Sequence, residues 1–403
     1  MSVEPPGKNF GSAIPEMAQM AKLIMKLGPD IDLIARISGQ YKETIRYRYK
    51  EKILAKGFAI QARLNFEGLG MQRVVMKVSL DDSYSRYARE IFLAMNKLCY
   101  LVSFNQLLPE GNYMLQASVP REYKQPFIDL MNQLKEIGMF RSVEFYTFDS
   151  FRNVPMRPEY FDFEHGDWDF DWTKTAEPAH EEEDAIPLGR FTFDKLDLLI
   201  LKELQADATR SLSEIRESIK TQNELDVNYK TLAWHWTRHV QEKRMINGYV
   251  LRWMGTTFDS VNERVNHRQR KYIMIPIFVR GITSTERADL TGEMNRIPFL
   301  WCEAVGDDYH AQFAFPVEMV NDAFSFLRDS LERFGQRATY SIFDQTNALS
   351  FTISYGMFDD DRRQWTFEGP ELLDRFEKLA VKMKENSGQS RARGSSRECR
   401  SRR

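Results

Sequence analysis

The residues with the clearest chemical potential lie in a basic, aromatic-rich stretch, YKETIRYRYKEKILAKGF, at positions 41–58. Lys42, Arg46, Arg48 and Lys50 place four cationic groups within nine residues of this stretch. On a helix, such side chains neutralise phosphates, while polar and aromatic neighbours read base edges in the major groove. The chemistry suggested is therefore nucleic-acid binding. The alternative is a solvated basic helix face without a ligand.

A variant of this stretch, NYKTLAWHWTRHVQEKRM, returns at positions 228–245. Aligning Thr44 with Thr231 keeps the apolar positions in register at a spacing of 187 residues (231 − 44). Solenoid repeats recur every 20–50 residues or so, and this spacing instead indicates a duplicated domain pair. The second copy is less basic, since Arg48 and Lys50 are replaced by His235 and Thr237. We therefore expect the first copy to carry most of any DNA affinity.

The elements around the first stretch predict a winged helix-turn-helix. Apolar residues fall at helical spacing in MAQMAKLIMKLG (17–28), and a short helix follows in DIDLIARISG (30–39). The basic stretch forms the third helix at 42–54, and FAIQARLNF (58–66) follows as a strand or wing. Beyond it, alternating strand and helix patterns give the order βαββαβ over 71–150, a ferredoxin-like arrangement.

The second half repeats this order, so the expected fold class is α+β, a tandem duplication of a winged helix-turn-helix followed by a ferredoxin-like βαββαβ domain. The expected divisions are an N-terminal arm (1–16), winged helix 1 (17–66), ferredoxin-like domain 1 (71–150), an acidic aromatic linker (151–190), winged helix 2 (191–255), ferredoxin-like domain 2 (270–355), a C-terminal helix (366–386) and a disordered Arg-rich tail (387–403). With 403 residues, the chain is long enough for several domains.

Charge is distributed unevenly, although the formal net charge is only −2. Residues 159–184 hold eleven acids and one Lys, a net of −10, whereas residues 388–403 hold six Arg and one Glu, a net of +5. The linker aromatics are expected to pack on the first domain. The alternative is an acidic segment that mimics nucleic acid or recruits transcription machinery. The tail has no apolar residues to bury and is expected to be disordered.

Other functional patterns are weak. His235 and His239 have the i, i+4 spacing of a helical chelate, but HWTRH lacks the Glu of an HExxH motif, so no metal is expected and the histidines should face solvent or DNA. Cys99, Cys302 and Cys399 form no metal or disulfide pattern. No apolar run reaches the roughly 18 residues of a membrane span. A cytoplasmic protein without a membrane partner is expected, with no catalytic residues and no cofactor.

Four segments resemble the Lrp/AsnC family of transcription regulators. FDKLDLLILKELQADATRSLSEI (193–215) is similar to the usual start of the family's DNA-binding domain. DLIARISGQYKETIRYRYKEKILAKGF (32–58) is similar to the helix-turn-helix, LNFEGLGM (64–71) to the element after the wing, and AVGDDYHAQFAF (304–315) to the Gly-Asp hairpin of the effector domain. The resemblance covers roughly 17–150 and 191–348. It implies a bacterial or archaeal DNA-binding regulator that pairs through its ferredoxin-like domains, as a homo-oligomer or as an intrachain pseudo-dimer.

The resemblance also implies the site residues. Expected contacts to double-stranded DNA are Lys42, Thr44, Arg46, Tyr47, Arg48, Lys50, Lys230, Thr231, Trp234, His235 and Arg238. An amino-acid-like effector is expected at Gly306, Asp307 and Asp308. The first half departs from the pattern, because it carries Pro109-Glu110-Gly111-Asn112 in place of a Gly-Asp pair.

The favoured interpretation is a sequence-specific transcription regulator that is not an enzyme. Two alternatives stay open. Siroheme decarboxylases share the architecture, but their His-Asn-Tyr and Asn-Leu-Trp-Phe-Thr segments are not found here, and the corresponding strand reads YHAQFAF (309–315). A protein-interaction module using its winged helices is the other alternative.

Overall fold

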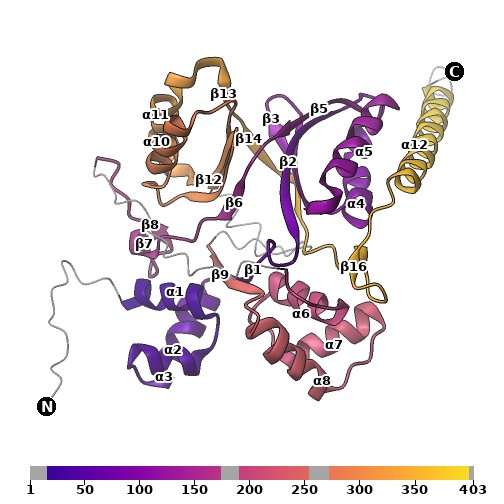
Figure 1. Ribbon diagram of the computed structural model, residues 1–403. Helices are drawn as coiled ribbons and strands as arrows, with labels where there is room; N and C mark the ends of the chain where they lie inside the picture. Colours follow the sequence, from indigo (N-terminus) through magenta and orange to yellow (C-terminus); the bar gives the residue numbers. More distant parts are fainter. Residues whose placement is uncertain (1–15, 174–189, 254–271, 399–403) are drawn as a thin grey trace, which may run out of the picture.

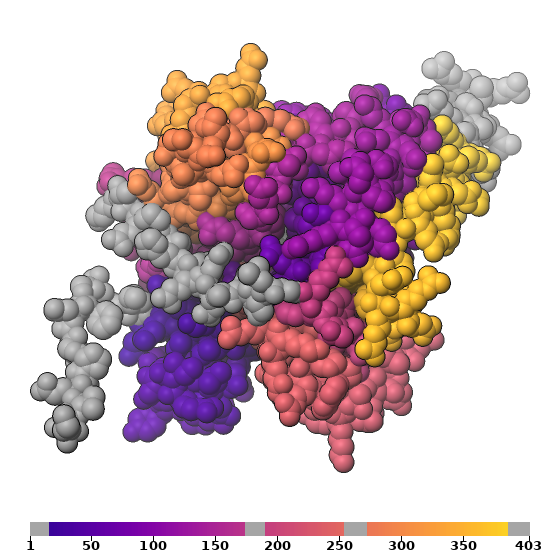
Figure 2. Space-filling model, in the orientation of Figure 1, coloured from indigo at the N-terminus to yellow at the C-terminus, as the bar shows by residue number. Residues whose placement is uncertain are grey.

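Two winged helices lie side by side below two β-sheets in the computed structural model, which describes residues 16–173, 190–253 and 272–398 (Figure 1). Space-filling shows the winged helices as separate lobes at the lower edge (Figure 2). The expected α+β tandem architecture is confirmed. The N-terminal arm, the acidic run 174–189, the basic run 254–271 and the end of the tail lie outside the described residues.

The first winged helix contains α1 (Glu16–Leu27), α2 (Ile31–Ser38), α3 (Lys42–Tyr47), its π-helical continuation η1 (Arg48–Leu54) and the wing strand β1 (Ala59–Leu64). The carboxylate of Asp30 caps α2 by accepting the N–H of Leu33 at 2.9 Å. Gly39, at φ 67°, ends α2 in the left-handed conformation that starts the turn into α3. Ile45, Tyr49 and Ile53 are buried, which fixes the inward face of the third helix.

The second winged helix contains α6 (Lys195–Ala206), α7 (Leu212–Asn223), α8 (Tyr229–Trp234), the π-helical η5 (His235–Gln241) and β9 (Ile246–Arg252). Capping boxes at Asp194 and Ser211 start α6 and α7. Strand β9 pairs antiparallel with β1, with Ile60 opposite Leu251. The two wings thus form one two-stranded sheet that joins the winged helices.

The first ferredoxin-like domain contains β2 (Met71–Leu80), α4 (Ala88–Leu98), β3 (Leu101–Leu108), β4 (Tyr113–Pro120), α5 (Lys124–Glu136) and β5 (Phe140–Tyr146). The second contains β10 (Tyr272–Val279), α10 (Ser284–Met294), β11 (Leu300–Val305), β12 (Tyr309–Pro316), α11 (Val320–Leu331) and β13 (Ala338–Tyr340). The order βαββαβ expected for each half is present in both.

Each sheet receives its fifth strand from the other half of the chain. Strand β6 (Ser150–Asn153) joins the second sheet beside β11, and β14 (Ile342–Ser350) joins the first sheet beside β3. The strand orders are therefore β14-β3-β4-β2-β5 and β13-β10-β12-β11-β6. This exchange was not expected from the sequence, because β6 is only four residues long and carries no alternating apolar pattern.

A small apolar core lies where the sheets meet. Its buried members, here called the inter-sheet core, are Val75, Leu107, Met114, Tyr146, Phe278 and Phe343. The Phe278 ring stacks on Tyr146 at a centroid distance of 4.6 Å. Both halves contribute side chains, and Phe343 belongs to an exchanged strand. The chain therefore forms an intrachain pseudo-dimer.

The segment from β6 to residue 173 packs on both halves. It contains a short hairpin, β7 (Phe161–Asp162) and β8 (Asp167–Trp168), and Phe161 packs edge-on against Phe58 of the first winged helix at 5.4 Å. Trp168 packs against Trp253 and Phe299 of the second half at 5.2 and 5.0 Å. The linker aromatics thus contact more than the first domain, to which the sequence assigned them.

An equivalent hairpin follows β14, formed by β15 (Phe358–Asp359) and β16 (Gln364–Trp365). The repeat of Phe-Asp and a later Trp shows that the hairpin belongs to each duplicated unit. Helix α12 (Gly369–Glu398) then packs on α5 and continues beyond its expected end at residue 386. Within the described ranges, no helix is both long and apolar enough to span a membrane.

The inter-sheet core predicts a large stability cost for truncating the exchanged strand. Phe343→Ala removes a ring that is 4% exposed, and we expect the free energy of unfolding to fall by about 3–5 kcal/mol. Val381→Ala, at a side chain that is 56% exposed, is the control and is expected to change it by less than about 0.5 kcal/mol. Urea unfolding followed by tryptophan fluorescence measures both. Equal effects would show that β14 is not part of a shared core.

Candidate functional site between the two sheets

The basic side chains of the first recognition helix face acidic partners. The ammonium of Lys42 lies 2.5 Å from Asp32, and the guanidinium of Arg46 lies 2.5 Å from Glu43. Arg48 contacts Glu16 and donates to the Gln40 side chain at 2.6 Å. Thr44, Tyr47 and Lys50 are exposed. The structure brings these residues onto one surface, but local ion pairs reduce its positive charge.

The second recognition helix differs. Lys230, Trp234 and Arg238 are exposed, Thr231 is half-buried, and Arg238 pairs with Glu242 at 2.8 Å. His235 is buried, and its Nδ1 lies 2.8 Å from the Asp197 carboxylate. The expectation that His235 faces solvent or DNA is wrong, because the side chain turns toward α6 where the helix becomes π-helical.

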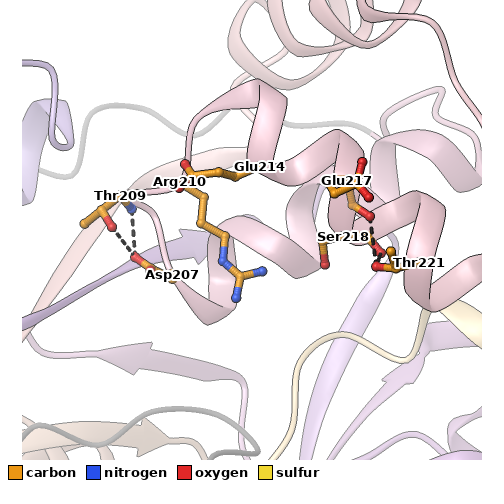
Figure 3. Close-up of a pocket in the computed structure, with 7 residues that line it drawn as sticks. All are labelled: Asp207, Thr209, Arg210, Glu214, Glu217, Ser218 and Thr221. Atoms are coloured by element: carbon orange, nitrogen blue, oxygen red, sulfur yellow. Dashed lines mark hydrogen bonds between the residues drawn. The ribbon is translucent and has the colours of Figure 1, made fainter.

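An open groove of about 450 Å³ lies on the second winged helix between the end of α6 and α7 (Figure 3). It is lined by Asp207, Thr209, Arg210, Glu214, Glu217, Ser218 and Thr221. Arg210, its one cation, already contacts the buried carboxylate of Glu203. The remaining charges are carboxylates, so the groove is unsuited to phosphate.

The Gly-Asp hairpin of the second half contacts residues 147–149, where the chain passes from the first sheet to β6 in the second sheet. A Cβ on Gly306 would lie 2.5 Å from the Cα of Phe148, so only glycine permits this approach. The Asp308 carboxylate accepts the N–H of Thr147 at 2.9 Å and of Gly281 at 3.1 Å. Asp307 also contributes its backbone carbonyl to the N–H of Ile282 at 2.8 Å. The residues expected to bind an effector thus fix the segment that leads into β6.

Polar side chains replace the inter-sheet core at the end nearer the wings. This inter-sheet polar layer, as we call it, contains Arg73, Gln116, Ser118, Arg252, Cys302 and Gln312. Arg73 and Ser118 are opposite each other on β2 and β4, so they share a sheet face, and Cys302 and Gln312 pair across β11 and β12. The Ser118 hydroxyl is buried and has no hydrogen-bond partner among the described residues. The Ser118 hydroxyl is therefore able to form a hydrogen bond to a group placed beside it.

Two guanidinium groups dominate the electrostatics of this layer. Arg73 lies 4.9 Å from the ring centroids of both Phe66 and Phe151. Burial lowers the pKa of Arg73 to about 10 and that of Arg252 to about 9, so both stay protonated at neutral pH. In the described parts of the chain, no carboxylate forms an ion pair with either. Half-buried cations without a counter-ion favour a bound anion, above all a carboxylate held by two parallel hydrogen bonds.

The surroundings of Arg252 are aromatic. Its guanidinium lies 3.8 Å from the Trp301 ring centroid, and its Nε donates to Gln61 at 2.9 Å. Nearby, burial raises the pKa of the Cys302 thiol to about 12, which keeps it neutral. The layer therefore combines two fixed cations with flat apolar surfaces, a combination that suits an aromatic or conjugated polycarboxylate.

A buried network beside the layer anchors β6 onto β11. The Glu303 carboxylate is fully buried and accepts hydrogen bonds from Arg152 at 2.6 Å and from the Tyr309 hydroxyl at 2.6 Å. Burial, with the negative charge of Glu303, raises the pKa of Tyr309 well above its usual value. Because each polar group here already has a partner, the network is structural and supplies no free group to a ligand.

His310 lies between the sheets at the edge of the layer. Its Nδ1–H donates to the Ile277 carbonyl at 2.9 Å, its Nε2 lies 3.0 Å from the Gln312 amide, and its ring stacks on Phe278 at 4.5 Å. Burial lowers the pKa of His310 to about 4, so the imidazole is neutral at pH 7.

Only solved structures resemble this chain. No family model and no curated protein matches it. The siroheme decarboxylase NirDL aligns over 90% of this chain and 100% of its own, with 9% identity and a TM-score of 0.50. AsnC of E. coli aligns over 36% of this chain and 99% of its own, with 15% identity and a TM-score of 0.27. The likeness to NirDL shows a shared fold across nearly the whole chain.

This result corrects one expectation. The expectation that the chain is not an enzyme is wrong, because the NirDL structure, which aligns with both halves of the chain, is that of an enzyme. The sequence reasoning relied on absent motifs, and at 9% identity a shared fold does not preserve motifs. It also missed Arg73 and Arg252, which are 179 residues apart in sequence (252 − 73) and which both lie close to the Cys302 thiol in the fold.

The burial of His310 predicts a loss of stability in mild acid. Because its folded pKa of about 4 is below the ordinary value of 6.5, the unfolded chain binds the proton more readily. This contribution is fully present above pH 6.5 and is lost as the pH falls toward 4. Between pH 7 and 5 the loss amounts to about 2 kcal/mol. His310→Gln should lose correspondingly less over this interval in urea unfolding. An unchanged pH dependence in the variant would contradict the assignment.

Proposed function

We propose that the chain binds a carboxylate-bearing tetrapyrrole in the inter-sheet polar layer and acts on it as an enzyme of the siroheme-decarboxylase type. The observation that carries this proposal is the pair of half-buried guanidiniums, Arg73 and Arg252, which lack carboxylate partners among the described residues. The fold shared with NirDL supports the substrate class.

The ligand chemistry follows from the layer. A tetrapyrrole is a flat conjugated ring with carboxylates around its edge. Arg73 and Arg252 hold two of these carboxylates through charge-assisted hydrogen bonds, and Ser118 offers a further hydroxyl. The Trp301 ring, which the Arg252 guanidinium covers, holds this cation in place. The iron of siroheme belongs to the substrate, so no resident metal is required at this site.

The arrangement also defines an orientation. In the first sheet, Arg73 pairs with Ser118 two residues in from the first pair of the ladder, Met71 with Pro120. In the second sheet the first pair is Tyr272 with Pro316, and the pair two residues in is Met274 with Ala314. Met274 and Ala314 therefore occupy the positions of Arg73 and Ser118. Gln116 and Gln312 are the equivalent residues that both sheets retain. The second sheet therefore has no equivalent of Arg73, and the second cation of the layer, Arg252, comes from the wing strand β9 instead. We expect one tetrapyrrole per chain, in a single orientation.

Substitution of the two arginines tests this proposal. Arg73→Ala and Arg252→Ala should each weaken binding of siroheme about 10- to 150-fold, because each removes a charge-assisted hydrogen bond worth about 1.5–3 kcal/mol. Arg141→Ala removes an arginine that is 56% exposed and pairs with Asp82 at the far edge of the sheet, so it should leave binding unchanged. Titration followed by visible absorption gives the affinities, and mass spectrometry of the tetrapyrrole detects loss of CO₂. Wild-type affinity in both variants would refute this site.

A second candidate function is binding to double-stranded DNA. It is favoured by the placement of α3 and α8 at the same lower edge of the molecule (Figure 1). The Tyr47 and Trp234 side chains at this edge are 59% and 52% exposed. The local ion pairs of Lys42, Arg46 and Arg48 weigh against strong phosphate attraction, although exposed pairs of this kind are weak and exchange readily.

DNA binding has its own test. If the first recognition helix binds DNA, Arg46→Ala combined with Lys50→Ala should weaken binding to genomic fragments and reduce the magnitude of its salt slope by up to about 2. Arg328→Ala with Lys378→Ala, both exposed and away from the winged helices, is the charge-matched control. Equal binding by the two double variants at several salt concentrations would exclude this surface as a DNA site.

A further inference from the structure

Two carboxylates and two imidazoles converge in the second winged helix. Asp194 and Asp197 lie at the start of α6, and His235 and His239 lie one turn apart on η5. One potential ligand atom from each lies within 4.8 Å of all the others. The Asp197 carboxylate is 2.8 Å from the Nδ1 of His235 and 2.8 Å from the Nδ1 of His239, and Asp194 is 3.7 Å from His235.

We propose that these four residues form a binding site for a divalent transition metal of the zinc class. Zn²⁺ binds His nitrogen and carboxylate oxygen at about 2.0–2.2 Å, in tetrahedral geometry when it has four protein ligands. Ligand atoms of such a site are separated by about 3.3–3.6 Å. The present separations, from 2.8 Å up to 4.8 Å, would therefore change by at most about 1.5 Å on binding. Two nitrogens with two oxygens suit Zn²⁺ better than Ca²⁺ or Mg²⁺, which prefer oxygen alone.

The local electrostatics favour a cation. Asp197 is fully buried among the leucines of α6, where an ionised carboxylate is costly without compensation. With neutral imidazoles the four groups carry a formal charge of −2, which one divalent ion cancels. Such an ion would replace the hydrogen bonds that the Asp197 carboxylate accepts from the two histidines, and it would connect α6 directly to η5. With four side-chain ligands the site is closed, which is typical of a structural metal rather than a catalytic one.

The first winged helix shows that this cluster is specific to the second copy. The equal-length helices α1 and α6 align Ala18 with Asp197, and both side chains are buried. At the repeat spacing of 187 residues, Arg48 corresponds to His235 and Lys52 to His239. The first copy thus has a buried apolar residue where the second copy has the Asp197 carboxylate. It also has two cationic side chains where the second copy has the imidazoles of His235 and His239. These differences together assemble a ligand set that no single one of them provides.

Metal binding to the full, untagged chain tests the proposal. After dialysis against chelator, calorimetric titration with Zn²⁺ should give one site per chain with Kd below about 0.1 µM, and Zn²⁺ should raise the melting temperature. Asp194→Ser, which keeps an N-cap hydroxyl, and His239→Gln should each weaken binding about a hundredfold. His165→Gln, at an exposed histidine outside the cluster, should bind as the wild type does.

Three results would overturn the proposal: no saturable Zn²⁺ binding by the wild type, wild-type affinity in both cluster variants, or loss of binding in His165→Gln. If circular dichroism shows that a cluster variant does not fold, the visible absorption spectrum of the wild type loaded with Co²⁺ tests the proposal instead. Intense visible d–d bands show four-coordinate binding with nitrogen and oxygen ligands, whereas weak six-coordinate bands contradict a closed tetrahedral site.

Discussion

The exchange of β6 and β14 is the constraint on which the remaining structure depends. Each sheet obtains its fifth strand from the opposite half, so neither ferredoxin-like domain is complete without the other. The exchanged strands place the two sheets face to face and create the inter-sheet core around Phe278 and Phe343. The buried Arg152–Glu303 pair fixes one crossing, and the backbone contacts of Asp308 fix the segment that leads to it. Both the wing pairing and the polar layer follow from this geometry.

Carrying both halves in one chain permits differences that identical subunits cannot have. In a symmetric dimer, every residue on one side of the interface appears on the other as well. Here the polar layer retains the equivalent Gln116 and Gln312, but Met274 holds the position in the second sheet that Arg73 holds in the first. The winged helices differ in the same way, with basic side chains in the first and a His/Asp cluster in the second. A ligand without two-fold symmetry can be held in one orientation at such an interface.

The sequence predicted the elements of the fold well, because they depend on local patterns. Apolar spacing and caps at Asp30, Asp194 and Ser211 define the helices, and the repeat defines the two halves. The strand exchange depended instead on non-local pairing, and SFRN at 150–153 carries no local signal that it leaves its own domain. The repeated hairpin left a trace in the sequence, since residues 161–168 and 358–365 share their first Phe-Asp and their final Trp, but the acidic composition of the first copy suggested a linker.

The residues of the proposed ligand site were harder to find for a related reason. A recognition helix is continuous in sequence, so its basic residues attract attention even though the structure pairs three of them with acids or amides. Arg73 and Arg252 belong to strands whose surroundings give no contiguous motif, and their importance arises from half-burial without a counter-ion in the described chain. A sequence pattern shows which charged residues exist. Desolvation and ion pairing decide which of these charges would be stabilised most by binding an oppositely charged ligand. The inter-sheet layer meets that condition better than the recognition helices do.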